Sequence, residues 1–171
     1  MGISRRRFLG GLSGAASLAA AGGANAASSA VSAEEKEKWA LSEEEWKNRL
    51  TPEQFQVLRR EGTERAFTSP LNEEKRKGVF ACAGCGLELF DSDMKYDSGT
   101  GWPSFFDVIP GRVETKTDFK LIYPRTEYHC ARCGGHQGHV FKDGPHPTGL
   151  RYCNNGVALT FRPAEEMGAE S

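Results

Sequence analysis

The sequence predicts a mainly β domain of antiparallel strands, preceded by short helices, in a chain of 171 residues. From Val79 onward, short apolar runs are separated by glycine, and we expect strands in GVFAC, ELFDS, DVIPG, KLIYP, YHCARC, GHVF, LRYC and VALTFRP. In the last run, Val157, Leu159 and Phe161 alternate with small or polar residues, the period of two that marks a half-buried strand. No unit of strand, helix and strand is evident, which favours antiparallel pairing.

Two short helices are expected before the strands. Ser42 with Glu45, and Thr51 with Gln54, match the capping box, in which a hydroxyl and a later carboxylate or amide satisfy free backbone N–H groups. The second helix is expected to end at Gly62. Each helix has an apolar face for the core, made by Trp46, Leu50, Phe55 and Leu58.

The N-terminal segment, residues 1–26, has the pattern of an export signal. Three arginines in Ser4–Leu9 precede a Gly/Ala-rich run, and Ala24-Asn25-Ala26 fits a signal peptidase site. The arginines resemble a twin-arginine signal, so we expect cleavage after Ala26 and a periplasmic protein. An uncleaved membrane anchor is disfavoured because the run is short and rich in glycine and serine.

The remaining chain divides into three expected parts: a solvated linker over residues 27–37, the folded domain over 38–165 and a polar tail over 166–171. Lys and Arg together number 22, against 23 Asp and Glu. This balance provides no basic surface for nucleic acid. We expect a monomer without a stable membrane anchor.

Four cysteines form two matching turns, Cys82-Ala-Gly-Cys85-Gly and Cys130-Ala-Arg-Cys133-Gly. Two such turns can place four thiolates around one Zn²⁺, and a closed sphere of four sulfur ligands is typical of a structural site. Two disulfides, or one redox-active pair, are the alternatives in an oxidising compartment. A protein exported already folded can bind zinc in the cytoplasm, which favours one structural Zn²⁺ per chain.

The fifth cysteine, Cys153, is the candidate nucleophile. On a strand, Arg151 and Cys153 share a face with Asn155, unless a bulge displaces the last of them. A guanidinium beside the sulfur favours the thiolate, so we expect a lowered thiol pKa. A buried, inert cysteine is the alternative, but the polar neighbours of Cys153 argue against it.

Two further segments can complete a site. GGHQGHVF supplies His136 and His139, which can donate protons near a reactive sulfur or serve as structural or metal-binding histidines. SGTGWPSFFDV supplies Trp102 and Phe105, which can form a pocket for a methyl or thioether group or belong to the core.

Taken together, the paired cysteine turns, SGTGWPSF, GGHQGHVF and GLRYCNN resemble, in this order, the methionine-(R)-sulfoxide reductase B family. The resemblance covers about Trp39 to Arg162. It implies two antiparallel sheets, in a β-tent or Mss4-like fold with zinc at one end. It also implies reduction of methionine-(R)-sulfoxide in oxidised proteins and peptides, a repair step after oxidative stress.

Carried over to matching positions, the resemblance makes Cys153 the nucleophile and Arg151 its electrostatic partner. His139 and His136 then bind and protonate the sulfoxide oxygen. Trp102 holds the S-methyl group, with Phe105 and Asn155 in the same pocket. Oxygen transfer leaves Cys153 as a sulfenic acid.

One position departs from the family pattern. Many family members have a resolving cysteine in SGxGWPSF, where this chain has Thr100. The chain has only five cysteines, so recycling is expected to require an external thiol, either a thioredoxin-like protein or a small thiol. The rival hypotheses are a zinc-ribbon-like binding module without activity and a peroxidatic cysteine enzyme.

Overall fold

The computed structural model describes residues 30–120 and 123–167. The predicted signal over residues 1–26, and most of the predicted polar tail, lie outside these ranges. Among the described residues, no helix has both the length and the apolar character needed to cross a membrane.

Three short helices begin the described chain: α1 (Ala33–Lys38), α2 (Glu43–Arg49) and α3 (Pro52–Arg60). The capping boxes predicted at Ser42 and Thr51 are confirmed. Helix α1 lies where a solvated linker was expected. Ser32 and Glu35 form a third capping box there, and the helix buries no residue, so its sequence lacked the apolar face that identified the other two.

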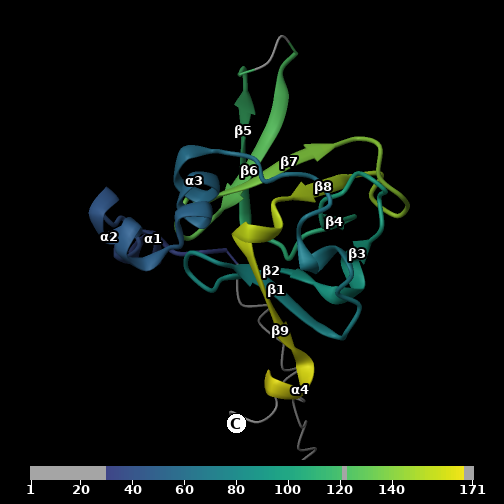
Figure 1. Ribbon diagram of the computed structural model, residues 1–171, viewed down its shortest axis with the longest axis horizontal. Helices are drawn as coiled ribbons and strands as arrows, with labels where there is room; N and C mark the ends of the chain where they lie inside the picture. Colours follow the sequence, from purple (N-terminus) through teal and green to yellow (C-terminus); the bar gives the residue numbers. More distant parts are fainter. Residues whose placement is uncertain (1–29, 121–122, 168–171) are drawn as a thin grey trace, which may run out of the picture.

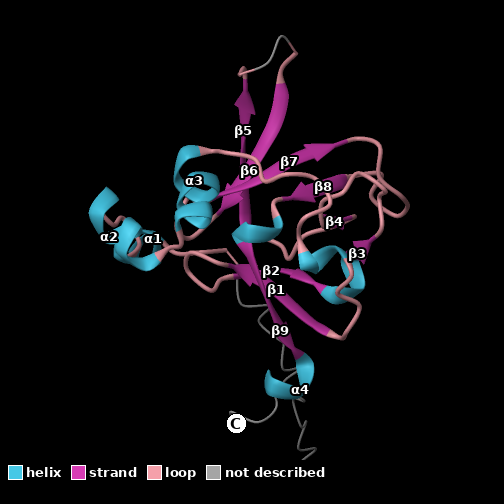
Figure 2. Cartoon of the chain, viewed as in Figure 1, coloured by secondary structure: helices cyan, strands magenta, loops and turns pink. Residues whose placement is uncertain are grey.

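The rest of the domain consists of two antiparallel sheets (Figures 1 and 2), as predicted. The smaller sheet has the strand order β2-β1-β9, with β1 (Gly78–Cys82) in the centre. Its neighbours are β2 (Glu88–Asp91) and β9 (Leu159–Pro163), and the short helix α4 (Ala164–Met167) follows β9. Three single 3-10 turns, η1 (Pro70–Asn72), η2 (Ser92–Met94) and η3 (Gly156–Ala158), lie in the connections.

The larger sheet has the strand order β3-β4-β8-β7-β6-β5. It comprises β3 (Lys95–Tyr96), β4 (Ser104–Phe105), β5 (Val113–Asp118), β6 (Arg125–Cys130), β7 (His136–Phe141) and β8 (Arg151–Asn154). The hairpin of β5 and β6 projects beyond the body of the domain in Figure 1.

The strand pattern differs from the prediction at DVIPG, residues 107–111, which forms no strand and ends in a turn. Of the predicted strand KLIYP, residues 121 and 122 lie outside the described ranges, and residues 120, 123 and 124 belong to no strand. The edge strand β5, by contrast, has four exposed residues in succession, so its sequence carries no apolar alternation.

The core lies between the two sheets and is rich in aromatic rings. Phe105 is fully buried and stacks on Phe90 of β2, with ring centroids 4.0 Å apart. Phe80 of β1 contacts Phe105 edge to face. The structure therefore supports the alternative interpretation of Phe105 as a core residue, and the ring does not line the pocket at Cys153 that is described below.

The helices cover the end of the molecule that carries the paired cysteines. Leu58 of α3 packs so closely on Gly135 that a β-carbon there would lie 2.9 Å from Leu58 Cδ2. The guanidinium of Arg59 stacks over Trp46 and donates a hydrogen bond to the Cys133 carbonyl oxygen at 2.9 Å. Helices α2 and α3 thereby hold the second cysteine turn in place.

Candidate active site and metal centre

The four paired cysteines converge in one buried cluster. Their sulfur atoms all lie within 4.8 Å of one another, and they are free rather than joined in disulfides. Across the two turns, Cys82 and Cys133 are 3.7 Å apart and Cys85 and Cys130 are 3.5 Å apart, measured between sulfurs. In a tetrahedral site with Zn–S bonds of about 2.3 Å, sulfurs lie about 3.8 Å apart, whereas a disulfide needs about 2.05 Å. The donor set and its spacing fit one bound metal ion.

The candidate nucleophile lies on the other face of the larger sheet from the core. Cys153 of β8 pairs directly with His139 of β7, which pairs in turn with Glu127 of β6. Directly opposed residues in antiparallel strands project to the same face, so these three side chains form one row. The alternate residues Asn154 and Tyr128 project into the core, where both are fully buried.

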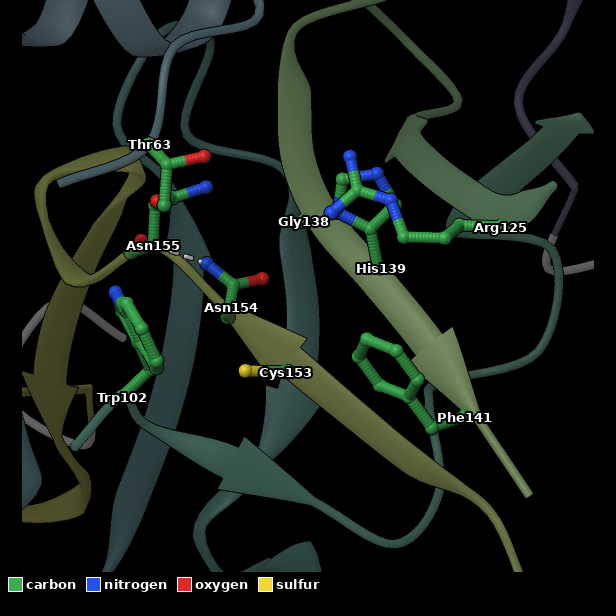
Figure 3. A pocket seen from close by; sticks show the side chains of 9 residues that line it. All are labelled: Thr63, Trp102, Arg125, Gly138, His139, Phe141, Cys153, Asn154 and Asn155. Carbon is green, nitrogen blue, oxygen red and sulfur yellow. Dashed lines mark hydrogen bonds between the residues drawn. The ribbon is translucent and has the colours of Figure 1, made fainter. Parts of the chain in front are cut away.

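Cys153 opens into a pocket of about 120 Å³. Figure 3 shows its sulfur between the indole of Trp102 on one side and the ring of Phe141 on the other. His139 and Arg125 form the far wall of the pocket, on the neighbouring strands (Figure 3). The complete lining is Thr63, Trp102, Arg125, Gly138, His139, Phe141, Cys153, Asn154 and Asn155. The pocket thus combines a thiol, aromatic walls and an imidazole.

Burial raises the pKa of the Cys153 thiol above its ordinary value. The positive charge of Arg151 and hydrogen bonding from Thr100 and Arg151 act in the opposite direction but do not outweigh the burial. The predicted lowering of the Cys153 pKa is therefore wrong, although the charge of Arg151 does act to lower it, as predicted.

Arg151 is itself paired, which limits its effect on the sulfur. Its Nε and one Nη donate to the two carboxylate oxygens of Asp143, at 2.9 and 2.8 Å. The guanidinium also lies over the Phe141 ring, 4.4 Å from its centroid. Arg151 is thus held rigidly beside Cys153, and part of its charge is neutralised by Asp143.

His139 is oriented by a carboxylate at the end of β5. Its Nε2 lies 2.7 Å from Asp118 Oδ2, which also accepts from Arg125 at 2.6 Å. Hydrogen bonds from the Lys120 backbone, His139 and Arg125 hold the pKa of Asp118 well below its usual range, so it is ionised and Nε2 must donate. Burial lowers the pKa of His139, which Asp118 partly offsets. His139 is therefore neutral at rest, with a carboxylate placed to stabilise its protonated form.

His136 lies deeper than the pocket. Its Nδ1 is 2.7 Å from Glu127 Oε1, both side chains are almost fully buried, and Nε2 has no hydrogen-bond partner among the described residues. Its ring centroid is 5.6 Å from that of His139. His136 therefore does not line the Cys153 pocket; it borders the adjoining cavity with Asp118, Glu127 and His139.

Trp102 and Asn155 are held by one residue that the sequence analysis missed. The Glu64 carbonyl accepts from Trp102 Nε1 at 3.1 Å, and the Glu64 backbone N–H donates to Asn155 Oδ1 at 3.0 Å. The Glu64 carboxylate accepts from the backbone N–H groups of Gly156 and Val157, at 2.5 and 3.0 Å. Glu64 thus ties the pocket wall to the turn after Cys153, and the amide of Asn155 is occupied within the protein.

The structure brings together most, but not all, of the predicted site. Cys153, His139, Trp102 and Asn155 line the pocket, and Arg151 lies beside it. Sequence reasoning missed the contributions of Glu64, Thr63, Asp118, Arg125, Glu127 and Phe141. One signal was present in RTEYHC, where Glu127 and His129 alternate with Tyr128 and Cys130, which are buried in the core. Glu64 has no such signal, because its partners are distant in the sequence.

Comparison with known proteins assigns the family. Residues 50–163 match the model of the SelR domain. The chain is 60% identical over 126 residues to a Methanosarcina barkeri protein named peptide methionine sulfoxide reductase MsrB, covering 73% of this chain and 89% of the relative. It is 53% identical over 122 residues to the Leptospira interrogans protein of that name, covering 71% and 93%.

A plant relative is similar to the same extent. The Arabidopsis thaliana protein named peptide methionine sulfoxide reductase B1, chloroplastic, is 53% identical over 135 residues, covering 78% of this chain and 67% of the relative. The match to the domain model spans both cysteine turns, the aromatic wall, His139 and Cys153. The chain therefore belongs to the SelR domain family, the MsrB family of methionine sulfoxide reductases.

Proposed function

We propose that this protein reduces methionine-(R)-sulfoxide in oxidised proteins and peptides to methionine. One observation carries the proposal: Cys153 opens into a small pocket with the indole of Trp102 on one side, and His139 projects from the same face of the sheet. A methyl sulfoxide presents an apolar methyl group and a basic oxygen on one sulfur. The pocket supplies a complementary group for each.

In the proposed reaction, the Cys153 sulfur attacks the sulfoxide sulfur while the proton that the thiol gives up is passed to the sulfoxide oxygen. The S–O bond of the substrate breaks, the oxygen is transferred to Cys153, and methionine leaves. The products are methionine and a Cys153 sulfenic acid, so the substrate gains two electrons and the thiol loses two. No further reactant enters this half of the cycle.

His139 is the proposed proton donor. Neutral His139 donates Nε2–H to the ionised carboxylate of Asp118, so its Nδ1 is free to take the proton that the Cys153 thiol gives up. The resulting imidazolium is stabilised by Asp118 and donates this proton to the sulfoxide oxygen. His136 supports this role from the adjoining cavity rather than from the pocket itself. Arg151 favours the developing thiolate, because its positive charge lowers the pKa of Cys153.

The four-cysteine cluster is proposed to hold one structural Zn²⁺ through Cys82, Cys85, Cys130 and Cys133. When bound, the metal cross-links the two turns and takes no part in the chemistry, because four sulfur ligands close its coordination sphere. A binding module without activity would need this cluster but would leave the pocket around Cys153 unexplained. The structure therefore favours the enzyme over the zinc-ribbon alternative.

Separate R and S sulfoxide epimers of a methionyl peptide test the proposal. The R epimer should be reduced in the presence of dithiothreitol, and the S epimer should be reduced at least about 100-fold more slowly, because a misplaced oxygen loses its hydrogen bond in the pocket. Chromatography of the peptide products measures both rates. Equal rates would contradict the stereochemical proposal, and turnover of hydrogen peroxide alone would favour the peroxidatic rival.

Recycling is proposed to use an external thiol, because the other four cysteines are committed to the metal cluster. Thr100 is close enough to Cys153 for hydrogen bonding to lower the thiol pKa, but its hydroxyl cannot attack a sulfenic acid to form a disulfide. A thioredoxin-like protein or a small thiol can instead attack the sulfenic acid and leave a mixed disulfide, which a second thiol resolves.

A single-turnover experiment tests this recycling route. Without reductant, the protein should release one methionine per chain and stop, with a mass gain of one oxygen and no internal disulfide. Mass spectrometry of the intact protein measures the change, and a matched sample without sulfoxide controls for oxidation by air. A disulfide between Cys153 and any metal-cluster cysteine would show that the cluster itself supplies the resolving thiol.

A further inference from the structure

A buried polar side chain connects the metal cluster to the strand that carries the nucleophile. Gln137 of β7 is fully buried. Its Nε2 donates to the Cys82 sulfur at 3.3 Å, and its Oε1 accepts from Asn154 Nδ2 at 3.3 Å. Asn154 is also fully buried and directly follows Cys153 on β8. Two amides therefore span the core between a metal-cluster sulfur and the residue next to the candidate nucleophile.

The three hydrogen bonds that link Tyr128, Asn154, Gln137 and Cys82 all run in one direction. The Tyr128 hydroxyl donates to Asn154 Oδ1 at 2.6 Å, Asn154 donates to Gln137, and Gln137 donates to the Cys82 sulfur. A neutral phenol and two amides can each pass on one donor in this way, and a thiolate is the natural final acceptor. Rotating the amide group of Asn154 or Gln137 by 180° would place two acceptor atoms opposite each other. The orientation of each side chain therefore fixes that of the next.

The same two residues also hold the backbone around the pocket. The Gln137 carbonyl accepts from the Asn155 backbone N–H at 2.8 Å and from Asn155 Nδ2 at 2.9 Å. The Asn154 backbone N–H donates to the Pro103 carbonyl at 2.9 Å, next to the Trp102 wall. A shift of Gln137 or Asn154 would therefore disturb the strand and wall that border Cys153.

From this arrangement we propose that Gln137 and Asn154 couple the metal cluster to strand β8, so that retention of the metal depends on Asn154 although Asn154 contacts none of its ligands. The inference rests on the metal occupancy proposed above. Groups that donate to metal ligands orient those ligands, and their loss typically weakens metal binding by about 10- to 100-fold. Gln137 has this role at Cys82, and Asn154 fixes the orientation of Gln137.

Two buried amides are less favourable in a core than apolar side chains of the same size. Burying an amide is unfavourable unless its donors and acceptors are satisfied, and apolar side chains of similar size fill a core without that requirement. A fully connected network instead selects one arrangement of its members. Here the network includes a metal-cluster sulfur, which apolar packing could not orient.

Zinc release tests the coupling. The full chain, loaded with zinc, is mixed with the coloured chelator 4-(2-pyridylazo)resorcinol, and the release rate is measured by absorbance. Gln137→Met keeps the size but removes the hydrogen bonds to Cys82 and from Asn154, together with a longer one to the Gly135 carbonyl at 3.5 Å, and should release zinc about tenfold faster. Asn154→Leu should also speed release severalfold. The double variant should release zinc no faster than Gln137→Met alone, because both changes break one connection.

Ser104→Ala is the matched control. Ser104 of β4 is fully buried and pairs with Cys153 of β8. Its hydroxyl forms hydrogen bonds with the Ser98 hydroxyl and the Trp102 carbonyl, and with neither Gln137 nor Asn154. Ser104→Ala should leave the rate of zinc release unchanged while lowering the melting temperature about as much as the Gln137 and Asn154 variants do. If Asn154→Leu does not fold, Asn154→Asp keeps the size and the acceptor for Tyr128, and the same acceleration is expected.

Four outcomes would overturn the inference: unchanged release from Asn154 variants, multiplicative acceleration in the double variant, equal acceleration in Ser104→Ala, or a wild-type protein that contains no metal. Because the readout is zinc release, it is independent of the reductase assay. An inactive wild-type protein that shows the coupling would refute the proposed reaction and leave this inference standing.

Discussion

Replacing Cys153 with serine should abolish reduction of a methionine-(R)-sulfoxide peptide, with a fall in rate of at least about 10³-fold. A serine hydroxyl does not ionise at neutral pH, and oxygen is a poor nucleophile toward a sulfoxide sulfur. The pocket offers no substitute thiol, because the other four cysteines lie together in the buried cluster. Product formation is measured by chromatography under the conditions of the epimer assay.

This test requires that Cys153→Ser loses activity through the missing thiol and not through a damaged fold. Cys153→Ser should keep the zinc content and melting temperature of the wild type, since the half-buried Cys153 contributes no ligand to the cluster. Arg151→Ala gives the graded comparison. Removing its charge should raise the thiol pKa further, so the enzyme should be slower at neutral pH but partly recover as the pH rises. Substantial activity in Cys153→Ser would mean that the nucleophile has been misidentified.

Replacing Cys82 with serine should release the metal and destabilise the fold severely. A wild-type chain should contain about one zinc ion, and the variant close to none at equal chelator concentration, because a hydroxyl is a poor zinc ligand at neutral pH. Structural zinc binds zinc-finger peptides with a free energy of about 10–16 kcal/mol at neutral pH, so loss of the metal should lower the free energy of unfolding substantially. Metal analysis and thermal unfolding measure the two effects.

Cys153→Ser is the matched control, because it is the same substitution outside the cluster and should leave metal content unchanged. Cys82→Ser is expected to lower the stability much more than the rate of the chemical step. That rate is measured at a temperature where the variant is still folded. Wild-type protein without metal, or with disulfides between the two cysteine turns, would contradict the prediction.

The sequence was most informative where residue type and local spacing determine the structure. Two Cys-x-x-Cys turns predict a convergent cluster because each turn alone directs two sulfurs the same way, and this cluster is confirmed. The capping boxes at Ser42 and Thr51 are similarly local. Helix α1 carried the same signal at Ser32, but the absence of an apolar face led to the expectation of a linker.

Features that depend on long-range contacts were not accessible from the sequence. Phe105 adjoins an aromatic wall in the sequence, but strand alternation turns its ring into the core, away from the pocket. Asp118 acts on His139 only because β5, β6 and β7 align in register. The thiol pKa of Cys153 depends on the balance between burial and Arg151, and spacing in the sequence reports only the second.

The raised pKa of Cys153 also affects how the protein endures an oxidising environment. Peroxide reacts with thiolates, so a thiol whose pKa is raised by burial is a poor target for direct oxidation. The remaining four cysteines are buried together in one cluster, which limits the access of peroxide to them. A repair enzyme built in this way avoids being consumed by the oxidant whose damage it reverses.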